Sequence, residues 1–219
     1  MEPSFWHERW RTGVIPFHQG KVNQMLERWF ETLELDAGIE IFVPLCGKAY
    51  DMRWLLDQQF RVLGVELSDI AAGDFFTENK LPLTRRQGER YGIFEGPNIR
   101  ILCGDIFDLD SPDMATVGGV YDRASLVALP ETSRGRYADH LITHLPAGVP
   151  MLLVSFEYDA RRMNGPPFSV AEAEVRSLYE SRYTVRQLES MEVIDKMPIF
   201  RERGLDSMIE HAFLCTDNR

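Results

Sequence analysis

The chain has 219 residues, of which 44% are hydrophobic and 26% charged, a composition typical of a globular domain that can bury a core. Lys and Arg number 24 against 34 Asp and Glu, so the formal net charge is -10. Because nucleic acids and anionic membrane surfaces attract basic faces, this charge disfavours both as partners.

Apolar runs are no longer than a strand, and charges interrupt the N-terminus. We therefore expect neither a membrane-spanning helix nor a signal peptide. Cys46, Cys103 and Cys215 lie in or beside apolar runs without a C-x-x-C spacing, which indicates buried, reduced thiols. These features predict a cytoplasmic protein with a single domain over residues 1–219. Nothing in the composition requires a second copy, so we expect a monomer.

The first 32 residues are rich in aromatic and charged side chains, and they predict one or two amphipathic helices that break near Gly13–Pro16. Strand-like and helical runs then alternate. The expected strands are Glu40–Leu45, Arg61–Leu67, Ile99–Cys103, Val117–Asp122, Pro150–Phe156, Thr184–Met191 and Glu210–Thr216. The expected helices are Tyr50–Gln59, Ala71–Asn79, Glu131–Leu145 and one that ends near Glu180, with Ser169 and Glu172 as a capping box.

Strands separated by helices imply right-handed crossovers and a mainly parallel sheet. The last two strands have no helix between them, so we expect them to form an antiparallel edge. Residues 82–98 contain three glycines and two prolines and are predicted to be irregular. The prediction is a Rossmann-like α/β fold: a mostly parallel seven-stranded sheet with helices on both faces, an antiparallel edge strand, and a helical lid over residues 1–32.

A short turn, Pro44–Lys48, leaves the first strand, and Glu66 ends the second. In a doubly wound sheet an adenosine-containing cofactor lies across such strand ends, and a carboxylate on the second strand accepts the ribose hydroxyls. The turn has Gly47 as its single glycine, so it matches neither G-x-G-x-x-G nor a P-loop. It therefore favours a cofactor without phosphates, such as S-adenosylmethionine. The alternatives are an ordinary turn and a solvated acid at a strand end.

Charged residues also follow the third and fourth strands. Asp105 stands where many adenosine-binding sheets place an acid near the adenine amino group, although a turn or helix-cap aspartate fits the pattern equally well. Asp122 and Arg123 end the central strand, beside the point where ligands bind in such sheets. An arginine there can hold an anionic acceptor or the cofactor carboxylate, while the alternative is a local ion pair.

A metal site is not expected. His140 and His144 have the i,i+4 spacing of ligands on one helix face, but no third ligand accompanies them, and residue 141 is leucine where a zinc protease would need glutamate. A solvated helix face explains the pair.

Several motifs together resemble the thiopurine S-methyltransferase family, in its bacterial form with a short N-terminus. The resemblance covers almost the whole chain in order. The matching segments are Trp6-His7-x-x-Trp10, Phe17-His18-Gln19, Phe42–Lys48, Gly64–Ser68, Tyr121–Arg123 and Gly165–Phe168.

The resemblance implies a class I methyltransferase that transfers a methyl group from S-adenosylmethionine to an aromatic or heterocyclic thiol, with thiopurines as diagnostic substrates. It also implies that selenium and tellurium compounds are acceptors, with a contribution to tellurite resistance. By position it implies cofactor contacts from Trp10, Leu45, Glu66, Arg123 and the Asp105–Ile106 pair.

For the acceptor, the resemblance implies that Phe17 lies in the lid beside the substrate. It also implies an arginine facing the substrate from the loop before the last strand. The length of this loop leaves both Arg201 and Arg203 as candidates.

We further hypothesise that Arg123 favours the acceptor thiolate and that Asp122 orients Arg123, so both are candidate catalytic residues. Two other functions remain open at this point. One is a nicotinamide-dependent oxidoreductase on the same sheet, which the missing G-x-G-x-x-G disfavours. The other is a non-catalytic protein that binds metalloid oxyanions.

Overall fold

The computed structural model describes residues 3–219; Met1 and Glu2, which begin the predicted 1–32 segment, lie outside the described residues. The helices are α1 (Pro3–Thr12), α2 (Gln24–Trp29), α3 (Tyr50–Asp57), α4 (Asp69–Glu78), α5 (Ser125–Ala128), α6 (Glu131–His144), α7 (Glu172–Tyr179) and α8 (Pro198–Glu202). Short 3-10 turns follow at Phe30–Leu33, Ile106–Asp108 and Ile194–Lys196.

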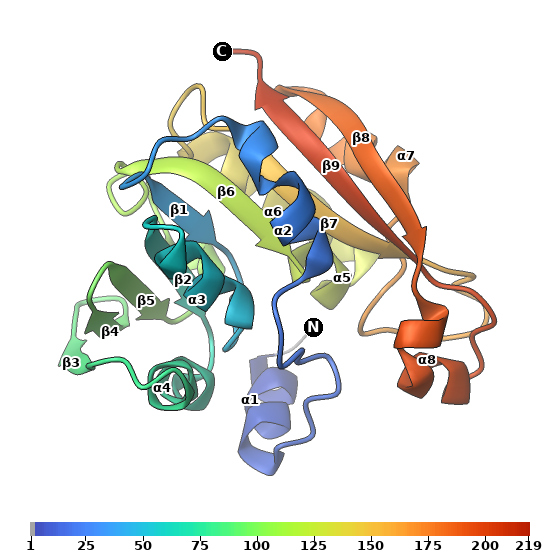
Figure 1. Ribbon diagram of the computed structural model, residues 1–219, viewed down its shortest axis with the longest axis horizontal. Coiled ribbons are helices and arrows are strands. Elements are labelled where there is room, and N and C mark those ends of the chain that lie inside the picture. Colours follow the sequence, from blue (N-terminus) through green and yellow to red (C-terminus); the bar gives the residue numbers. More distant parts are fainter. Residues whose placement is uncertain (1–2) are drawn as a thin grey trace.

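One mixed sheet forms the centre of the molecule (Figure 1). Within residues 3–219 it has nine strands in the order β3-β4-β5-β2-β1-β6-β7-β9-β8. The strands are β1 (Glu40–Val43), β2 (Arg61–Glu66), β3 (Thr84–Gln87), β4 (Gly92–Gly96), β5 (Ile99–Cys103), β6 (Val117–Arg123), β7 (Met151–Glu157), β8 (Tyr183–Glu192) and β9 (Ile209–Asp217).

The five central strands β5, β2, β1, β6 and β7 are parallel, which confirms the predicted crossovers. The last two strands pair with each other in antiparallel register, as expected. However, β9 inserts between β7 and β8, so the antiparallel strand is second from the edge and β8 is outermost. The chain order reverses between β1 and β6, where a doubly wound sheet binds its ligand.

Two sequence predictions were wrong. The sheet has two more strands than the seven expected, because part of residues 82–98 folds as the antiparallel pair β3 and β4, and β4 extends the sheet beyond β5. The capping box does not form either. Ser169 is used elsewhere: its hydroxyl accepts from the backbone N of Tyr158 and donates to the carbonyl of the same residue, and α7 begins after Ala171 without a side-chain cap.

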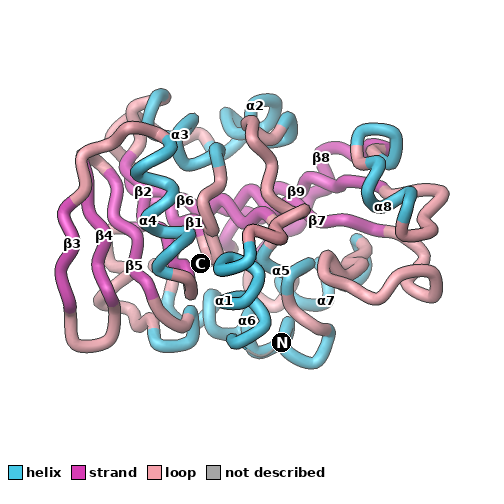
Figure 2. Tube along the Cα trace, turned by 90° about the horizontal axis from the view of Figure 1, so that it is seen from below, coloured by secondary structure: helices cyan, strands magenta, loops and turns pink. Residues whose placement is uncertain are grey.

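Helices cover both faces of the sheet, as Figure 2 shows. On one face α2, α3 and α4 bury Met25, Leu55 and Phe75 among the side chains of β1 and β2. On the other face α6 and α7 bury Tyr137 and Val175. All four residues of β1 are buried, as a parallel strand covered on both sides requires.

The N-terminal segment forms two helices separated by residues 13–23, as predicted, and α1 lies at the carboxyl ends of the parallel strands (Figures 1 and 2). None of the helices within residues 3–219 combines the length and the apolar character that a bilayer crossing requires.

Candidate active site

A cavity of about 800 Å³ opens at the carboxyl ends of the parallel strands, beneath the N-terminal segment. Its wall includes Leu45 after β1, Glu66 at the end of β2, Arg123 at the end of β6 and Phe156 on β7. Adjacent strands lie ~4.8 Å apart, so the distance from β2 to β7 across the floor is about 14 Å. The cavity is therefore long enough for a nucleoside at one end and a second small molecule at the other.

The turn after β1 is shaped by two residues in the left-handed region, Leu45 with φ 45° and Gly47 with φ 52°. Glycine adopts this conformation readily, whereas leucine is strained in it. A Cβ atom at residue 47 would lie 3.1 Å from the ring of Trp10, so glycine also allows the lid to approach. The turn thus brings Leu45 and Gly47 to the cavity without the glycine cradle that phosphates need.

Glu66 lies where the sequence predicted a ribose-binding acid. Its Oε2 accepts from the backbone N of Gly47 and its Oε1 from that of Ser68, both at 2.8 Å. Burial raises the pKa of Glu66 to about 7, although these backbone hydrogen bonds act to lower it. Each carboxylate oxygen keeps a second lone pair, so the group can also accept from a pair of ligand hydroxyls.

Asp105 and Ile106 both line the cavity, at the end of β5. Asp105 caps the 3-10 turn that follows, because its Oδ1 accepts from the backbone N of Phe107 at 3.0 Å. Asp105 therefore acts as a turn aspartate through Oδ1, as one interpretation of the sequence held. Its side chain is nevertheless exposed and lines the cavity. Ile106 is buried, and the guanidinium of Arg136 stacks 3.7 Å from the ring centroid of Phe107. This end of the cavity offers flat and apolar surfaces beside one acid.

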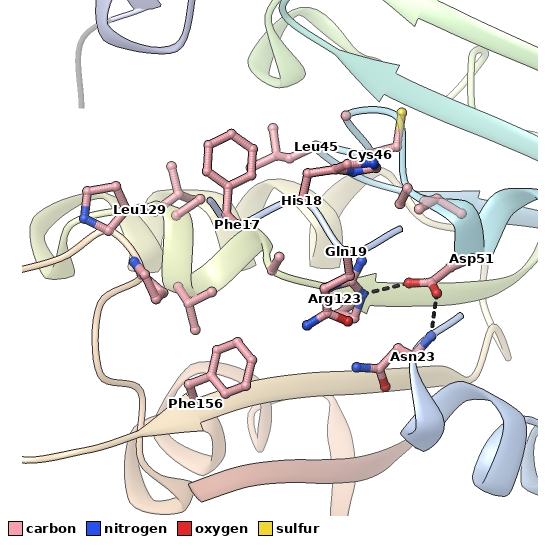
Figure 3. A pocket seen from close by; sticks show the side chains of 18 of the residues that line it. Phe17, His18, Gln19, Asn23, Leu45, Cys46, Asp51, Arg123, Leu129 and Phe156 are labelled. Carbon is pink, nitrogen blue, oxygen red and sulfur yellow. Dashed lines mark hydrogen bonds and ion pairs between the residues drawn. The ribbon is translucent and has the colours of Figure 1, made fainter. Parts of the chain in front are cut away.

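Arg123 is held by an acid that the sequence analysis did not single out. Its Nε donates to Oδ2 of Asp51 at 2.6 Å, and the Arg123 side chain is 9% exposed (Figure 3). Burial alone would lower the pKa of Arg123, but the Asp51 carboxylate outweighs that effect and raises it above its usual range. Among residues 3–219 the side-chain partner of Arg123 is Asp51, bonded through Nε. The two terminal nitrogens therefore remain for a ligand in the cavity.

Asp122 does not orient Arg123, which corrects that hypothesis. Successive residues of a strand point to opposite faces of a sheet, so Asp122 lies on the α6 side. There its Oδ2 accepts from the hydroxyl of Tyr137 at 2.7 Å. Burial raises the pKa of Asp122 to about 6, and it is 1% exposed. Asp122 is thus a buried residue behind the cavity wall, and the alternative of an Asp122–Arg123 ion pair is also wrong.

The N-terminal segment forms the roof of the cavity. Phe17 stacks edge-to-face between Trp6 and Trp10, with both centroid separations at 5.5 Å. All three rings line the cavity, and Trp10 is buried. Figure 3 places Phe17 and His18 next to Leu45. The roof is therefore shorter than the lid expected over residues 1–32, because α2 packs its buried residues against the sheet.

Neither arginine proposed for the acceptor site lines the cavity. Arg201 is on α8 and pairs with Asp195 at the surface. Arg203 donates to the carbonyls of Pro166 and Asn164, at 3.3 Å and 3.1 Å. The wall there is instead made by apolar residues of the same loop and its neighbours, namely Met197, Pro198, Ile199, Phe200, Pro166 and Pro167. Arg203 supports this wall from outside.

Sequence analysis did not identify Asn23, Asp51 or Glu210, which form a hydrogen-bonded set beside Arg123 in the cavity wall. Asp51 follows the turn after β1 in the first turn of α3, so an acid six residues beyond Leu45 was a usable signal. Asn23 and Glu210 meet only in the folded chain, where the Asn23 amide donates to Glu210 at 2.8 Å. No local pattern could have linked residues 187 positions apart. Within the described part of the chain, no group of three or more His, Cys, Asp or Glu residues is arranged to hold a metal ion.

Comparisons with known proteins agree with this geometry. A thiopurine S-methyltransferase from Nitrosospira multiformis is 44% identical over 98% of this chain and 97% of its own length. One from Pseudomonas entomophila is 44% identical over 99% of this chain and 100% of its own.

Among solved structures, the 1,6-didemethyltoxoflavin-N1-methyltransferase of Burkholderia thailandensis, with S-adenosylhomocysteine bound, superposes with a TM-score of 0.66 at 17% identity. That alignment covers 98% of this chain and 87% of the other. This structural likeness supports the assignment of a methyltransferase-like α/β fold. The family described as Thiopurine S-methyltransferase (TPMT) matches residues 1–218. The chain therefore belongs to the thiopurine S-methyltransferase family of S-adenosylmethionine-dependent methyltransferases.

Proposed function

We propose that this protein methylates the sulfur of aromatic or heterocyclic thiols, thiopurines among them, with Arg123 holding the acceptor as its thiolate. The observation that supports this most directly is the setting of Arg123. Its Nε is tied to Asp51, while Phe17, Leu129 and Phe156 lie on the other side of it in the same cavity (Figure 3). A cation beside aromatic and aliphatic walls suits a flat, apolar anion.

The residues present fit S-adenosylmethionine at the other end. Glu66 would accept the ribose hydroxyls, and Asp105 with Ile106 would contact the adenine. Leu45 and Trp10 would contact the cofactor from the turn and the lid. The site contains a turn with one glycine and no phosphate cradle, which agrees with a nucleoside that carries no phosphate. When bound, S-adenosylmethionine supplies an electrophilic methyl group on a positively charged sulfur.

The residues of this chain act by holding and shielding the reactants. A thiolate is already a strong nucleophile, so the site needs to select the ionised form and place it in line, not to supply a strong base. The Arg123 guanidinium favours that anion, and the roof made by Trp6, Trp10 and Phe17 excludes water from it. Asp122 takes no part, because it lies on the other face of the sheet.

The same cation and apolar wall suit other soft chalcogen anions. The family resemblance also predicts methylation of selenium and tellurium compounds and a contribution to tellurite resistance, and both remain predictions. A monomeric state and a cytoplasmic location remain predictions as well. Arg201 is the weaker of the two loop arginines as an acceptor contact, since Asp195 already engages it at the surface.

An acceptor panel tests the proposal. Purified protein is incubated with S-adenosylmethionine and thiophenol, a thiopurine, selenite or tellurite, and S-adenosylhomocysteine is measured. We expect release with the aromatic thiols. The family assignment disfavours the oxidoreductase and the oxyanion-binding alternatives. Binding of NADH in preference to S-adenosylmethionine, or oxyanion binding without S-adenosylhomocysteine release, would favour one of them over our proposal.

A further inference from the structure

Asp51 connects two parts of the site that the sequence keeps apart. It is fully buried, and its two oxygens receive three hydrogen bonds, two from residues of β6 and one from the residue that caps α2. Oδ2 accepts from Nε of Arg123 at 2.6 Å and from the hydroxyl of Tyr121 at 3.1 Å. Oδ1 accepts from the backbone N of Asn23 at 2.8 Å, and Figure 3 shows Asp51 between Arg123 and Asn23.

Asn23 is the residue at which the N-terminal segment joins the body of the protein. Its side-chain oxygen caps α2 by accepting from the backbone N of Met25 at 2.8 Å. Its side-chain amide donates to Glu210 on β9, also at 2.8 Å. The bond from its backbone N to Asp51 fixes the direction in which residues 3–22 leave α2. Those residues include Trp6, Trp10 and Phe17, which form the roof of the cavity.

A buried ion pair is weak evidence for a purely stabilising role, because well-packed apolar residues often stabilise a fold as much. The Arg123–Asp51 pair lines a cavity, and one oxygen of the acid is committed to the base of the lid. Both features indicate that the Asp51 carboxylate positions Arg123 and the base of the lid.

We infer that Asp51 is a positioning residue that couples the seating of residues 3–22 over the cavity to the orientation of Arg123. The inference rests on the proposed role of Arg123 as the acceptor contact. An ionised carboxylate can accept on both oxygens at once. An asparagine in its place has one accepting oxygen, and its amide nitrogen would then face a donor, either Arg123 Nε or the backbone N of Asn23. Asp51→Asn therefore removes one of the two attachments while it preserves the shape of the side chain.

The experiment compares Asp51→Asn with Asp57→Asn, which changes an exposed acid on the same helix whose ion-pair partner within residues 3–219 is Arg53. One readout is the kcat for S-adenosylhomocysteine release with an aromatic thiol. The other is trypsin cleavage after Lys21, an exposed residue two positions before Asn23, with cleavage after the exposed Arg203 as the internal reference. We expect Asp51→Asn to lower kcat and to speed cleavage after Lys21, each by about tenfold to a hundredfold. Asp57→Asn should change neither.

If Asp51→Asn changes only kcat or only cleavage after Lys21, the two are not coupled and the inference is overturned. Equal acceleration of cleavage after Lys21 and after Arg203 would also overturn it, because it would show a general loosening of the fold. If Asp51→Asn alone does not fold, Arg123→Met is compared with the double variant Asp51→Ala/Arg123→Met, which has no unpaired buried cation and no side-chain acceptor at residue 51 for the backbone N of Asn23. Faster cleavage after Lys21 in the double variant supports the coupling, and equal cleavage contradicts it. A wild-type protein that methylates no acceptor contradicts the proposed function instead, while the cleavage comparison still decides whether Asp51 seats the lid.

Discussion

Arg123 donates from its Nε to the Asp51 carboxylate at 2.6 Å, across the gap between the end of β6 and the first turn of α3. This contact fixes the guanidinium while its two terminal nitrogens remain for a ligand. Because the two residues belong to elements on either side of the switch point in the sheet, the cavity floor carries one fixed cation where a doubly wound fold binds its ligands.

Substitution of Arg123 by lysine should abolish most of the methyl transfer. Lysine keeps the charge but has no planar fork, so it cannot bond Asp51 and an anionic acceptor in the same geometry. We expect kcat/KM for an aromatic thiol to fall about a hundredfold, as measured by S-adenosylhomocysteine release. The control is Arg53→Lys, at an exposed i,i+4 pair on α3, which should behave as wild type. Wild-type turnover by Arg123→Lys would show that the reaction does not need the planar guanidinium of Arg123.

Glu66→Gln should weaken the binding of S-adenosylhomocysteine about tenfold to a hundredfold, because the amide nitrogen would face the backbone donor of Gly47 or Ser68. Glu40→Gln is the matched control. Glu40 is also a buried glutamate, but it begins β1 at the opposite end of the sheet and pairs with Arg61. Titration calorimetry should show unchanged affinity for Glu40→Gln, and equal losses in the two variants would argue against a ribose contact at Glu66.

The affinity for S-adenosylhomocysteine should depend on pH through Glu66. The pKa of Glu66 is about 7 in the free protein, and hydroxyl donors from a ligand favour its ionised form. S-Adenosylhomocysteine affinity should therefore rise between pH 5.5 and 7, by up to about tenfold per pH unit, and level off above 7. In Glu66→Gln this rise should be absent. A wild-type affinity that falls over the same interval would contradict the assignment.

Asp122→Asn should leave methyl transfer near the wild-type rate, because Asp122 bonds Tyr137 on the far side of the sheet and an asparagine oxygen can still accept that bond. Its pKa of about 6 lies above the unfolded value of ~3.9. Its contribution to stability is therefore fully present below pH ~3.9 and is lost as the pH rises through about 6.

The variant lacks this loss, so from pH 4 to pH 7 its free energy of unfolding should rise relative to wild type by about 1–3 kcal/mol. Urea denaturation at the two pH values measures this difference. A large loss of turnover in a folded Asp122→Asn protein would restore a catalytic role for Asp122.

Trp10→Ala should weaken S-adenosylhomocysteine binding about tenfold, with little change in Tm, because the ring connects the lid to the turn at Gly47 more than it fills the main core. Phe5→Ala removes a ring that stacks on Trp6 outside the cavity wall and serves as the control. A Trp10→Ala protein with unchanged affinity and a sharply lowered Tm would show that the helix only packs into the core.

The sequence allowed the central parallel sheet to be predicted because its strands are short apolar runs separated by helices, and this signal is local. The pair β3 and β4 was missed because both strands are short, and all four residues of β3 are exposed. They join the sheet because β3 pairs with β4 and β4 pairs with β5, and sequence periodicity does not show such pairing. Ser169 likewise had the right spacing for a helix cap, but its hydroxyl bonds Tyr158 across a loop instead.

Sequence analysis located cavity residues correctly where they end a strand, and it missed contacts that join distant segments. Glu66 and Arg123 end β2 and β6, so their place at the cavity followed from the order of elements. Asp122 was predicted to be the partner of Arg123, although successive residues of a strand point to opposite faces of the sheet. Asp51 lies 72 positions from Arg123, so the pairing of these two residues could be identified only from the fold.

The product balance with an aromatic thiol tests most directly whether this protein transfers a methyl group to sulfur with the help of Arg123. S-Adenosylmethionine and thiophenol are incubated with the wild-type protein and with Arg123→Lys, and the methyl thioether and S-adenosylhomocysteine are quantified by mass spectrometry. We expect equal amounts of the two products with the wild type and a small fraction of either with the variant. Intact S-adenosylmethionine after incubation of folded wild-type protein with thiophenol and a thiopurine would contradict this expectation.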